Sequence, residues 1–148
     1  MEWPLSYEID RSKCLVLVTY HEQPSFAQWM QTMDRIFADP AYHPQFGILL
    51  DRQKILRPAE TEYIKQMVGY IDDRRTRGTL ARWAILVCDI GSYGMGRMAE
   101  QLSSCTHSIR TFKQKGDAEM WLANNRGDPA WPQHSLDADQ PSPGGGRN

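Results

Sequence analysis

The sequence has no strong surplus of charge and few cysteines. Its 17 lysine and arginine residues nearly balance 18 aspartate and glutamate residues, which gives a formal net charge of −1. A dedicated nucleic-acid-binding domain usually carries a clear basic surplus, so we expect no nucleic-acid partner. The cysteines Cys14, Cys88 and Cys105 stand at unrelated spacings, which is typical of reduced thiols in a cytoplasmic protein. Cys88 lies in an apolar, strand-like run, and we expect it to be buried.

Long hydrophobic runs are also missing. The longest apolar run, from Trp83 to Cys88, is far shorter than the roughly 20 residues that span a bilayer, so we expect no membrane span. The N-terminal segment has no basic stretch followed by an apolar one, so the sequence predicts no signal peptide and a cytoplasmic location. Histidines and cysteines stand at no metal-ligand spacing, and we expect neither a metal site nor a cofactor.

The C-terminal part of the chain differs in composition from the rest. Residues 126–148 contain four of the nine prolines and four of the eleven glycines, but only four hydrophobic side chains. Burial in such a segment cannot compensate for the entropy that ordering would cost. The composition therefore predicts one folded domain over residues 1–125 and a disordered tail over residues 126–148.

The pattern of apolar residues alternates between strand-like and helix-like segments before the tail. Strand-like runs occur at Tyr7–Asp10, Cys14–Tyr20, Phe46–Asp51, Arg82–Asp89 and Ser108–Phe112. Helical patterns begin at Ser25, Pro58, Ser92 and Asp117, which are residue types that favour helix starts. The predicted order of elements is ββαβαβαβα. Strand–helix–strand units with apolar central strands predict an α/β fold with a mostly parallel sheet.

Polar side chains collect where two central strands are predicted to end. Open α/β sheets bind ligands outside the carboxyl ends of their strands, so Asp51, Arg52 and Asp89 mark a candidate site. Tyr93 and Arg97 lie four residues apart on the next helix and can face the same edge. We expect this crevice to bind an anionic or polar group of a ligand or partner. Because paired carboxylates can also carry out acid–base chemistry, an enzyme that uses Asp51 and Asp89 is a less favoured alternative.

A second set of candidate residues is apolar. Methionine and aromatic side chains adapt well to small apolar ligands, but they are equally typical of an ordinary core. The candidate pocket residues are Phe46, Met67, Trp83, Met95 and Met98. Both interpretations stay open at this point.

Three stretches together resemble a known family. They are Ala38–Pro40 before the strand Phe46–Asp51, Ala81–Val87 running into Tyr93–Met98, and Phe112 with Ala118–Leu122. This pattern resembles the SpoIIAA-like fold, which is shared by STAS domains of anti-sigma-factor antagonists and by small bacterial stand-alone proteins. The resemblance implies a single-wound, mostly parallel five-stranded sheet with its helices mainly on one face.

The resemblance also implies a function. It implies a non-enzymatic binding or regulatory module that acts through protein contacts or, alternatively, a carrier or sensor of a small apolar or amphipathic ligand. Sigma-antagonist STAS domains carry a phosphorylatable Ser or Thr after the strand that ends here at Asp51. This chain has no hydroxyl side chain between Asp51 and Thr61, so the resemblance does not bring a phosphorylation switch with it.

The middle strands are apolar at successive positions, as in Ile48–Leu50. Successive side chains of a strand point to opposite faces, so both faces of the sheet need a cover. We expect the second face to be covered either by the N-terminal segment with Trp3 and Leu5 or by a second subunit in a weak homodimer. A strict monomer in light scattering at high concentration would remove the dimer.

Truncation after Asn125 tests the predicted tail. The thermal midpoint should change by less than about 2 °C, because a segment with little apolar content adds no stability and a loss of even 1 kcal/mol would shift it further. Differential scanning calorimetry of the two chains is the measurement. A drop of about 5 °C or more would show that Trp131 docks on the folded domain.

Overall fold

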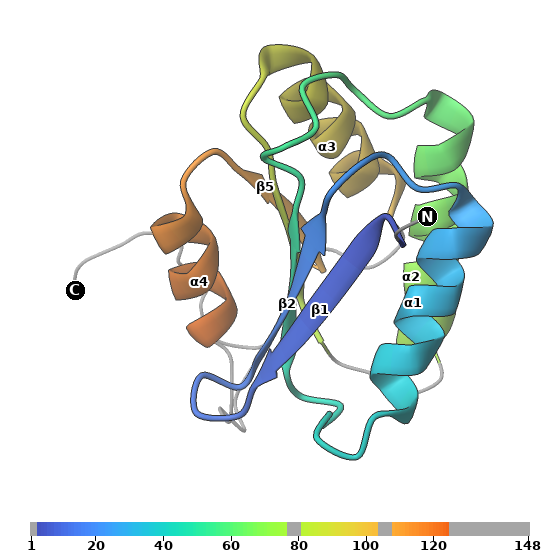
Figure 1. Cartoon of the computed structure of the whole chain (residues 1–148). Coiled ribbons are helices and arrows are strands. Elements are labelled where there is room, and N and C mark those ends of the chain that lie inside the picture. Colours follow the sequence, from blue (N-terminus) through green and yellow to red (C-terminus); the bar gives the residue numbers. More distant parts are fainter. Residues whose placement is uncertain (1–2, 77–80, 104–107, 125–148) are drawn as a thin grey trace.

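The computed structural model describes residues 3–76, 81–103 and 108–124, so the predicted tail at residues 126–148 lies outside the described residues. The strands are β1 (Leu5–Asp10), β2 (Leu15–Tyr20), β3 (Gly47–Asp51), β4 (Trp83–Leu86) and β5 (Ile109–Phe112). The helices are α1 (Phe26–Ala38), α2 (Thr61–Thr76), α3 (Ile90–Leu102) and α4 (Lys115–Ala123) (Figure 1). The order of these elements confirms the predicted ββαβαβαβα.

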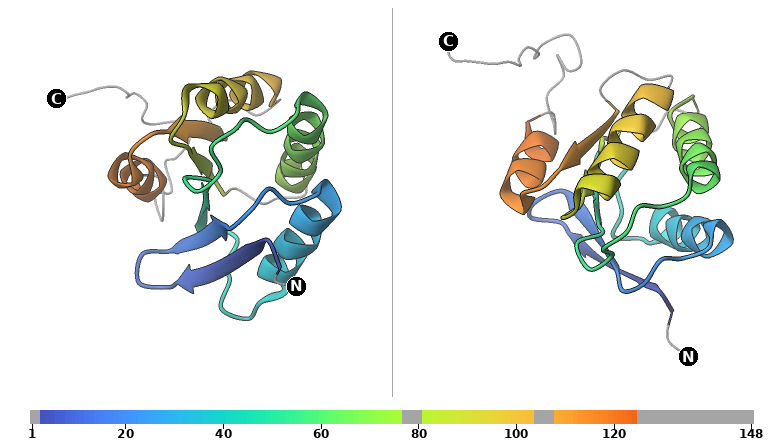
Figure 2. Two further views of the ribbon diagram at one scale, coloured as in Figure 1. Left: turned by 45° about the horizontal axis from the view of Figure 1, so that its top comes forward. Right: turned by 90° about the horizontal axis from the view of Figure 1, so that it is seen from above.

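The five strands form one sheet in the order β1-β2-β3-β4-β5. The β1–β2 pair is antiparallel, and the other three pairs are parallel, which confirms the predicted mostly parallel sheet. Helices α1, α2 and α3 lie on one face of the sheet, and α4 lies on the other (Figures 1 and 2). The carboxyl ends of β2, β3 and β4 therefore meet at one edge, where α3 begins.

Local signals explain where two of the helices begin. Helix α1 starts with a capping box: the Ser25 hydroxyl accepts the Gln28 N–H at 3.1 Å, and the Gln28 side chain accepts the Ser25 N–H at 2.9 Å. Helix α3 starts earlier than predicted, because Asp89 is its cap and accepts the Ser92 N–H at 2.9 Å. The prediction that Ser92 caps this helix is therefore wrong.

Strand β4 is shorter than predicted, and this changes the position of Cys88. The strand ends at Leu86, and the chain turns into the Asp89 cap. Cys88 lies in that turn and is exposed. The expectation of a buried Cys88 is wrong. The apolar run in the sequence extends to Cys88, but the strand ends two residues earlier, at Leu86.

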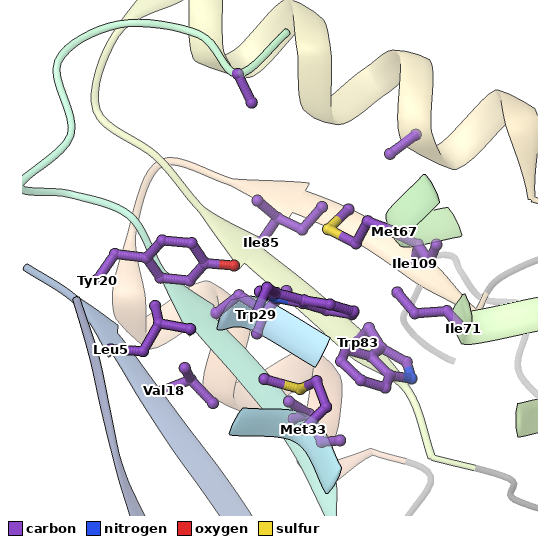
Figure 3. Close-up of a cluster of buried hydrophobic side chains, with 14 of the residues drawn as sticks. Leu5, Val18, Tyr20, Trp29, Met33, Met67, Ile71, Trp83, Ile85 and Ile109 are labelled. Atoms are coloured by element: carbon purple, nitrogen blue, oxygen red, sulfur yellow. The ribbon is translucent and has the colours of Figure 1, made fainter. Parts of the chain in front are cut away.

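The main core fills the space between the sheet and helices α1, α2 and α3. Two fully buried tryptophans meet there, Trp29 of α1 and Trp83 of β4, with ring centroids 6.0 Å apart (Figure 3). Phe46 and Met67 belong to the same cluster. Burial of side chains of this size contributes about 1.5–3 kcal/mol each, so this cluster is the principal source of stability.

A smaller core lies under α4 on the second face of the sheet. It is formed by Leu15, Leu49, Ala84, Leu86, Ala118 and Leu122. The expected cover by the N-terminal segment is wrong, since Leu5 belongs to the main core and the Trp3 indole donates to Thr32 of α1 at 2.9 Å. Helix α4 supplies the cover over β3 and β4. The homodimer loses this supporting argument and stays a prediction.

Two glycines of α3 form a matched pair for testing how closely this helix packs on β5. A Cβ on Gly96 would lie 2.6 Å from Cγ2 of Thr111, whereas a Cβ on Gly94 would meet nothing within 4 Å. Gly96→Ala should lower the free energy of unfolding by about 1–3 kcal/mol through overpacking. Gly94→Ala should raise it by up to about 1 kcal/mol, because alanine is the better helix former. Chemical denaturation measures both, and equal effects of the two substitutions would contradict the packing.

Candidate functional site

A buried arginine lies at the carboxyl end of β3. The Arg52 N–H donates to the carbonyl of Leu86 at 2.8 Å, which continues the β3–β4 ladder by one residue. Side chains alternate along this extended segment, so Arg52 points to the face of helices α1–α3 and Asp51 to the face of α4. Arg52 is only 6% exposed. Its guanidinium carbon lies 5.0 Å from the centre of the Tyr20 ring, which is cation–π distance.

The Arg52 guanidinium has unused hydrogen-bonding capacity. One of its terminal nitrogens, Nη2, is buried without a hydrogen-bond partner among the residues that the structure describes. Arg52 also forms no ion pair with a carboxylate in those residues. A buried charge is normally paired, because its removal from water is costly. Arg52 is therefore a buried, unpaired charge that does not stabilise the fold.

Other buried polar atoms gather around the same guanidinium. The hydroxyls of Tyr20, at the end of β2, and Tyr63, in the first turn of α2, have no hydrogen-bond partner in the described chain, and the indole N–H of Trp29 has none either. The Tyr20 hydroxyl points into the interior beside Ile85 and Trp29 (Figure 3). Each buried group without a partner costs about 1–3 kcal/mol, so several in one place indicate a binding site.

A small cavity connects these groups. Tyr20, Arg52, Tyr63 and Ser92 line it together with apolar side chains, and its volume is about 20 Å³. That volume accommodates one water molecule, which needs about 10–15 Å³. A larger group must therefore displace part of the lining when it enters.

The predicted apolar pocket is divided between this cavity and the core. Met67 and Met95 line the cavity. Phe46 and Trp83 lie in the main core, and Met98 packs against that core from α3. The five side chains therefore do not surround one common space.

Both phenols around the cavity are held in their neutral form. Burial raises the pKa of Tyr20 above its ordinary value of 10.0, although the positive charge of Arg52 opposes this rise. Burial also raises the pKa of Tyr63. Tyr20 and Tyr63 are therefore protonated at neutral pH, and each can donate a hydrogen bond to an oxygen atom placed beside Arg52.

Asp89 adds a carboxylate close to this cluster. Hydrogen bonding from Ser92 and, to a lesser extent, the positive charge of Arg52 hold the pKa of Asp89 below its ordinary value of 3.8. At the helix start its Oδ2 accepts the Ser92 N–H, whereas its Oδ1 is buried without a hydrogen-bond partner among the described residues. The first turn of α3 and the Arg52 guanidinium thus lie on the same side of the sheet.

The structure brings together two of the five polar residues that the sequence marks as a site, namely Arg52 and Asp89. Asp51 lies on the α4 face and accepts the Gln53 N–H at 3.0 Å. Tyr93 lines a different groove beside β5. Arg97 is 54% exposed and pairs with Glu100 at 3.2 Å. The site thus consists of side chains from four elements rather than of a crevice between β3 and β4.

Sequence reasoning missed Tyr20 and Tyr63. Tyr20 is the last residue of β2, so the same rule that selected Arg52, the gathering of ligands at strand ends, could have included it. Tyr63 is part of the apolar stripe of α2, and it reaches the cavity beside Arg52 only through the packing of α2 on the sheet. No local signal in the sequence indicates that position.

The Asp89 cap gives a pH-dependent prediction. Asp89→Ala should lower the free energy of unfolding at pH 7 by about 1 kcal/mol, the usual value of a helix cap. Because the folded pKa of Asp89 is lowered, this stabilisation is present above the unfolded value of 3.8 and is lost as the pH falls through the lower folded value. The difference between the two proteins should therefore shrink on acidification, as measured by urea unfolding between pH 7 and pH 2.5.

Asp89→Asn is the matched control for the charge. Asparagine caps helices about as well as aspartate, so this variant should keep most of the stability at pH 7 without the pH dependence of that group. If Asp89→Ala lowers the free energy of unfolding as much at pH 2.5 as at pH 7, the result would contradict the role of the carboxylate.

Comparisons with known proteins add no further assignment to this site. The chain matches no protein-family model, no curated protein and no solved structure. Within the described ranges, no helix is both long and apolar enough to cross a membrane. The same part of the chain contains no cluster of three or more histidine, cysteine, aspartate or glutamate side chains that could hold a metal ion.

Proposed function

We propose that this chain is a non-enzymatic binding and regulatory module with a SpoIIAA-like, STAS-type fold, and that it binds one anionic group at Arg52. The observation that carries this proposal is the buried guanidinium with an unpartnered nitrogen at the carboxyl end of the strands. A planar guanidinium suits a carboxylate or a phosphate, which it can contact with two parallel hydrogen bonds.

The fold supports the comparison with STAS domains at the level of architecture. The sheet has sequential strand order, one antiparallel edge pair and three helices on one face. In this arrangement the strand ends and the start of α3 gather at one edge, where a partner has access to both. Fold likeness alone does not define a function, so the proposal depends on the residues of the site.

The surroundings of Arg52 favour binding over catalysis. Tyr20 and Tyr63 can donate hydrogen bonds, and their raised pKa values keep them from acting as bases near neutral pH. The enzyme alternative requires Asp51 and Asp89 in one crevice, but strand alternation directs Asp51 to the opposite face of the sheet. The cluster thus provides hydrogen-bond donors for an anion, and it has Asp89 as a nearby carboxylate but not Asp51.

Exposed apolar side chains beside the site favour protein contacts. Leu56 in the β3–α2 connection is 73% exposed, and Ile90 at the start of α3 is 83% exposed. A Cβ on Gly91 would lie 3.3 Å from Pro58, so this connection packs on the first turn of α3. Exposed large apolar side chains of this kind can form part of a surface for a partner. Ala59 of the same connection lines the cavity, so the connection must move when a group larger than water enters.

The alternative of an apolar-ligand carrier requires a larger change. Small-molecule pockets usually measure about 300–1,000 Å³, whereas the cavity at Met67 and Met95 measures about 20 Å³. A lipid that co-purifies with the native protein in mass spectrometry would favour this alternative over an anion-binding module.

Anion binding can be tested through thermal stability. At ten times its Kd, a ligand stabilises the folded state by about 1.4 kcal/mol, which corresponds to a rise of roughly 3–6 °C in the midpoint. We expect such a rise with phosphate or acetate at constant ionic strength, and none in Arg52→Met. Arg57→Met is the matched control, because Arg57 is an exposed arginine of the same connection. A response to free phosphate or acetate shows that Arg52 binds an anion, and tighter binding of an acidic or phosphorylated peptide than of the free anion assigns that anion to a protein partner.

The stability of Arg52→Met without ligand provides the counter-test. Replacing an unpaired buried charge with an apolar side chain of similar length should leave the midpoint unchanged or raise it. A fall of several degrees, together with no anion response in the wild type, would show that Arg52 is a structural residue and would contradict the proposal.

A further inference from the structure

Strand β5 is the edge strand of the sheet and lies between α3 and α4 (Figure 2). Side chains of these three elements line a second concave surface there. It is an open groove of about 510 Å³, and we name it the β5–α4 groove. Its principal side chains are Tyr93, Arg110, Phe112, Lys113, Met120 and Trp121. Tyr93 is the only one of these residues that the sequence marked as part of a candidate site.

Two cations stand over aromatic rings in the groove. The Lys113 ammonium lies 4.8 Å from the centre of the Tyr93 ring, and the Arg110 guanidinium carbon lies 5.3 Å from the centre of the Phe112 ring. Neither cation forms an ion pair within the part of the chain that the structure describes. Asp117 is the single carboxylate in the lining, so the groove carries a positive surplus. Contacts with the rings hold both charges near their positions before a partner arrives.

The apolar part of the groove is exposed but firmly supported. Met120 is 65% exposed, and the rings of Phe112 and Trp121 lie with centroids 5.6 Å apart. Arg82 holds Trp121 from below, since its guanidinium donates to the Trp121 carbonyl at 3.0 Å and lies 4.6 Å from the ring centre. Tryptophan, methionine and arginine are enriched at protein interfaces, and rigid anchors of this kind lower the entropic cost of binding.

The edge of β5 is closed to a simple additional strand. The Thr111 N–H already donates to the Glu100 carboxylate at 2.8 Å, so a partner strand cannot use this group without breaking that bond. An incoming chain would therefore be recognised by the side chains of the groove rather than by strand addition.

We propose that the β5–α4 groove is a docking site for an acidic segment of a partner protein. Carboxylates of that segment pair with Arg110 and Lys113, and an adjacent large apolar side chain packs against Met120 and Trp121. Charge complementarity and the exposed apolar floor are the features that select this occupant. The groove differs from the Arg52 site, so this inference does not depend on the proposed anion binding there.

Single-stranded nucleic acid fits the same groove less well. Such binders offer open aromatic faces on which bases stack. Here each of the three rings carries a cation over a face: Lys113 over Tyr93, Arg110 over Phe112 and Arg82 over Trp121. The net charge of the whole chain, −1, also lacks the basic surplus of a nucleic-acid binder.

Peptide titration of the full-length, nitrogen-15-labelled chain tests the proposal. The probe is an eight-residue peptide with one leucine among four glutamates, and the control peptide has lysines in place of the glutamates. We expect saturable shifts of the Phe112 and Lys113 amides and of the Trp121 indole with the acidic peptide alone. Arg110→Ala with Lys113→Ala should weaken binding about tenfold or more, as loss of two rim contacts predicts. The matched control is Lys54→Ala with Lys65→Ala, two exposed lysines outside the groove.

Each other outcome overturns the proposal. Equal binding of both peptides, or an unchanged Kd in the groove double variant, would show that charge does not select the occupant. Stronger binding of an oligothymidylate than of the acidic peptide would assign the groove to nucleic acid. Shifts of the groove signals when Trp131→Ser is introduced without peptide would show that the C-terminal segment of this chain is the occupant. All substituted lysine and arginine side chains are exposed, so their removal should leave the fold intact, as circular dichroism will confirm.

Discussion

One backbone hydrogen bond, from the Arg52 N–H to the Leu86 carbonyl, determines the character of the candidate site. It extends the β3–β4 ladder beyond Asp51, and the alternation of side chains then directs Arg52 into the interior and Asp51 to the opposite face. A guanidinium in that position lies between the ends of β2 and β3, the start of α2 and the first turn of α3. The same register places the Arg52 guanidinium close to the side chains of Tyr20, Tyr63 and Asp89.

The cluster around Arg52 is costly, and the core around it offsets the cost. Unpartnered phenols and an unpaired guanidinium each reduce stability. Next to them lies an aromatic core in which Trp29 and Trp83 are fully buried. A protein that keeps such groups gives up stability for a site that is ready to bind, which is a common compromise at functional positions.

The architecture could be predicted from the sequence to a large extent, because it depends on local signals. The apolar runs of β2, β3 and β4 and the Ser25–Gln28 capping box lead directly to the order of elements. The start of α3 was placed wrongly, since Asp89 and Ser92 are both good caps and only the end of β4 decides between them. The cover of the second face was missed because α4 presents just Ala118 and Leu122 as buried residues.

The site could be predicted only in part. Arg52 and Asp89 follow from their position after strands, a rule that needs no tertiary structure. Tyr93 and Arg97 satisfy the same rule by helical spacing, but the actual rotation of α3 turns them toward β5 and solvent. Tyr63 joins the site through packing between α2 and the sheet. The positions of the two cations in the β5–α4 groove depend on the contacts of Arg110 and Lys113 with the aromatic rings. Contacts of this kind arise from the assembled fold.

The central claim is that Arg52 binds an anion, and the nitrogen-15 signals of its guanidinium report on this binding directly. Titration with phosphate or acetate at constant ionic strength should shift the Arg52 Nε and Nη signals saturably and leave those of Arg57 unchanged. Arg52 signals that do not respond at the highest anion concentration, or that respond no more than those of Arg57, would contradict the account.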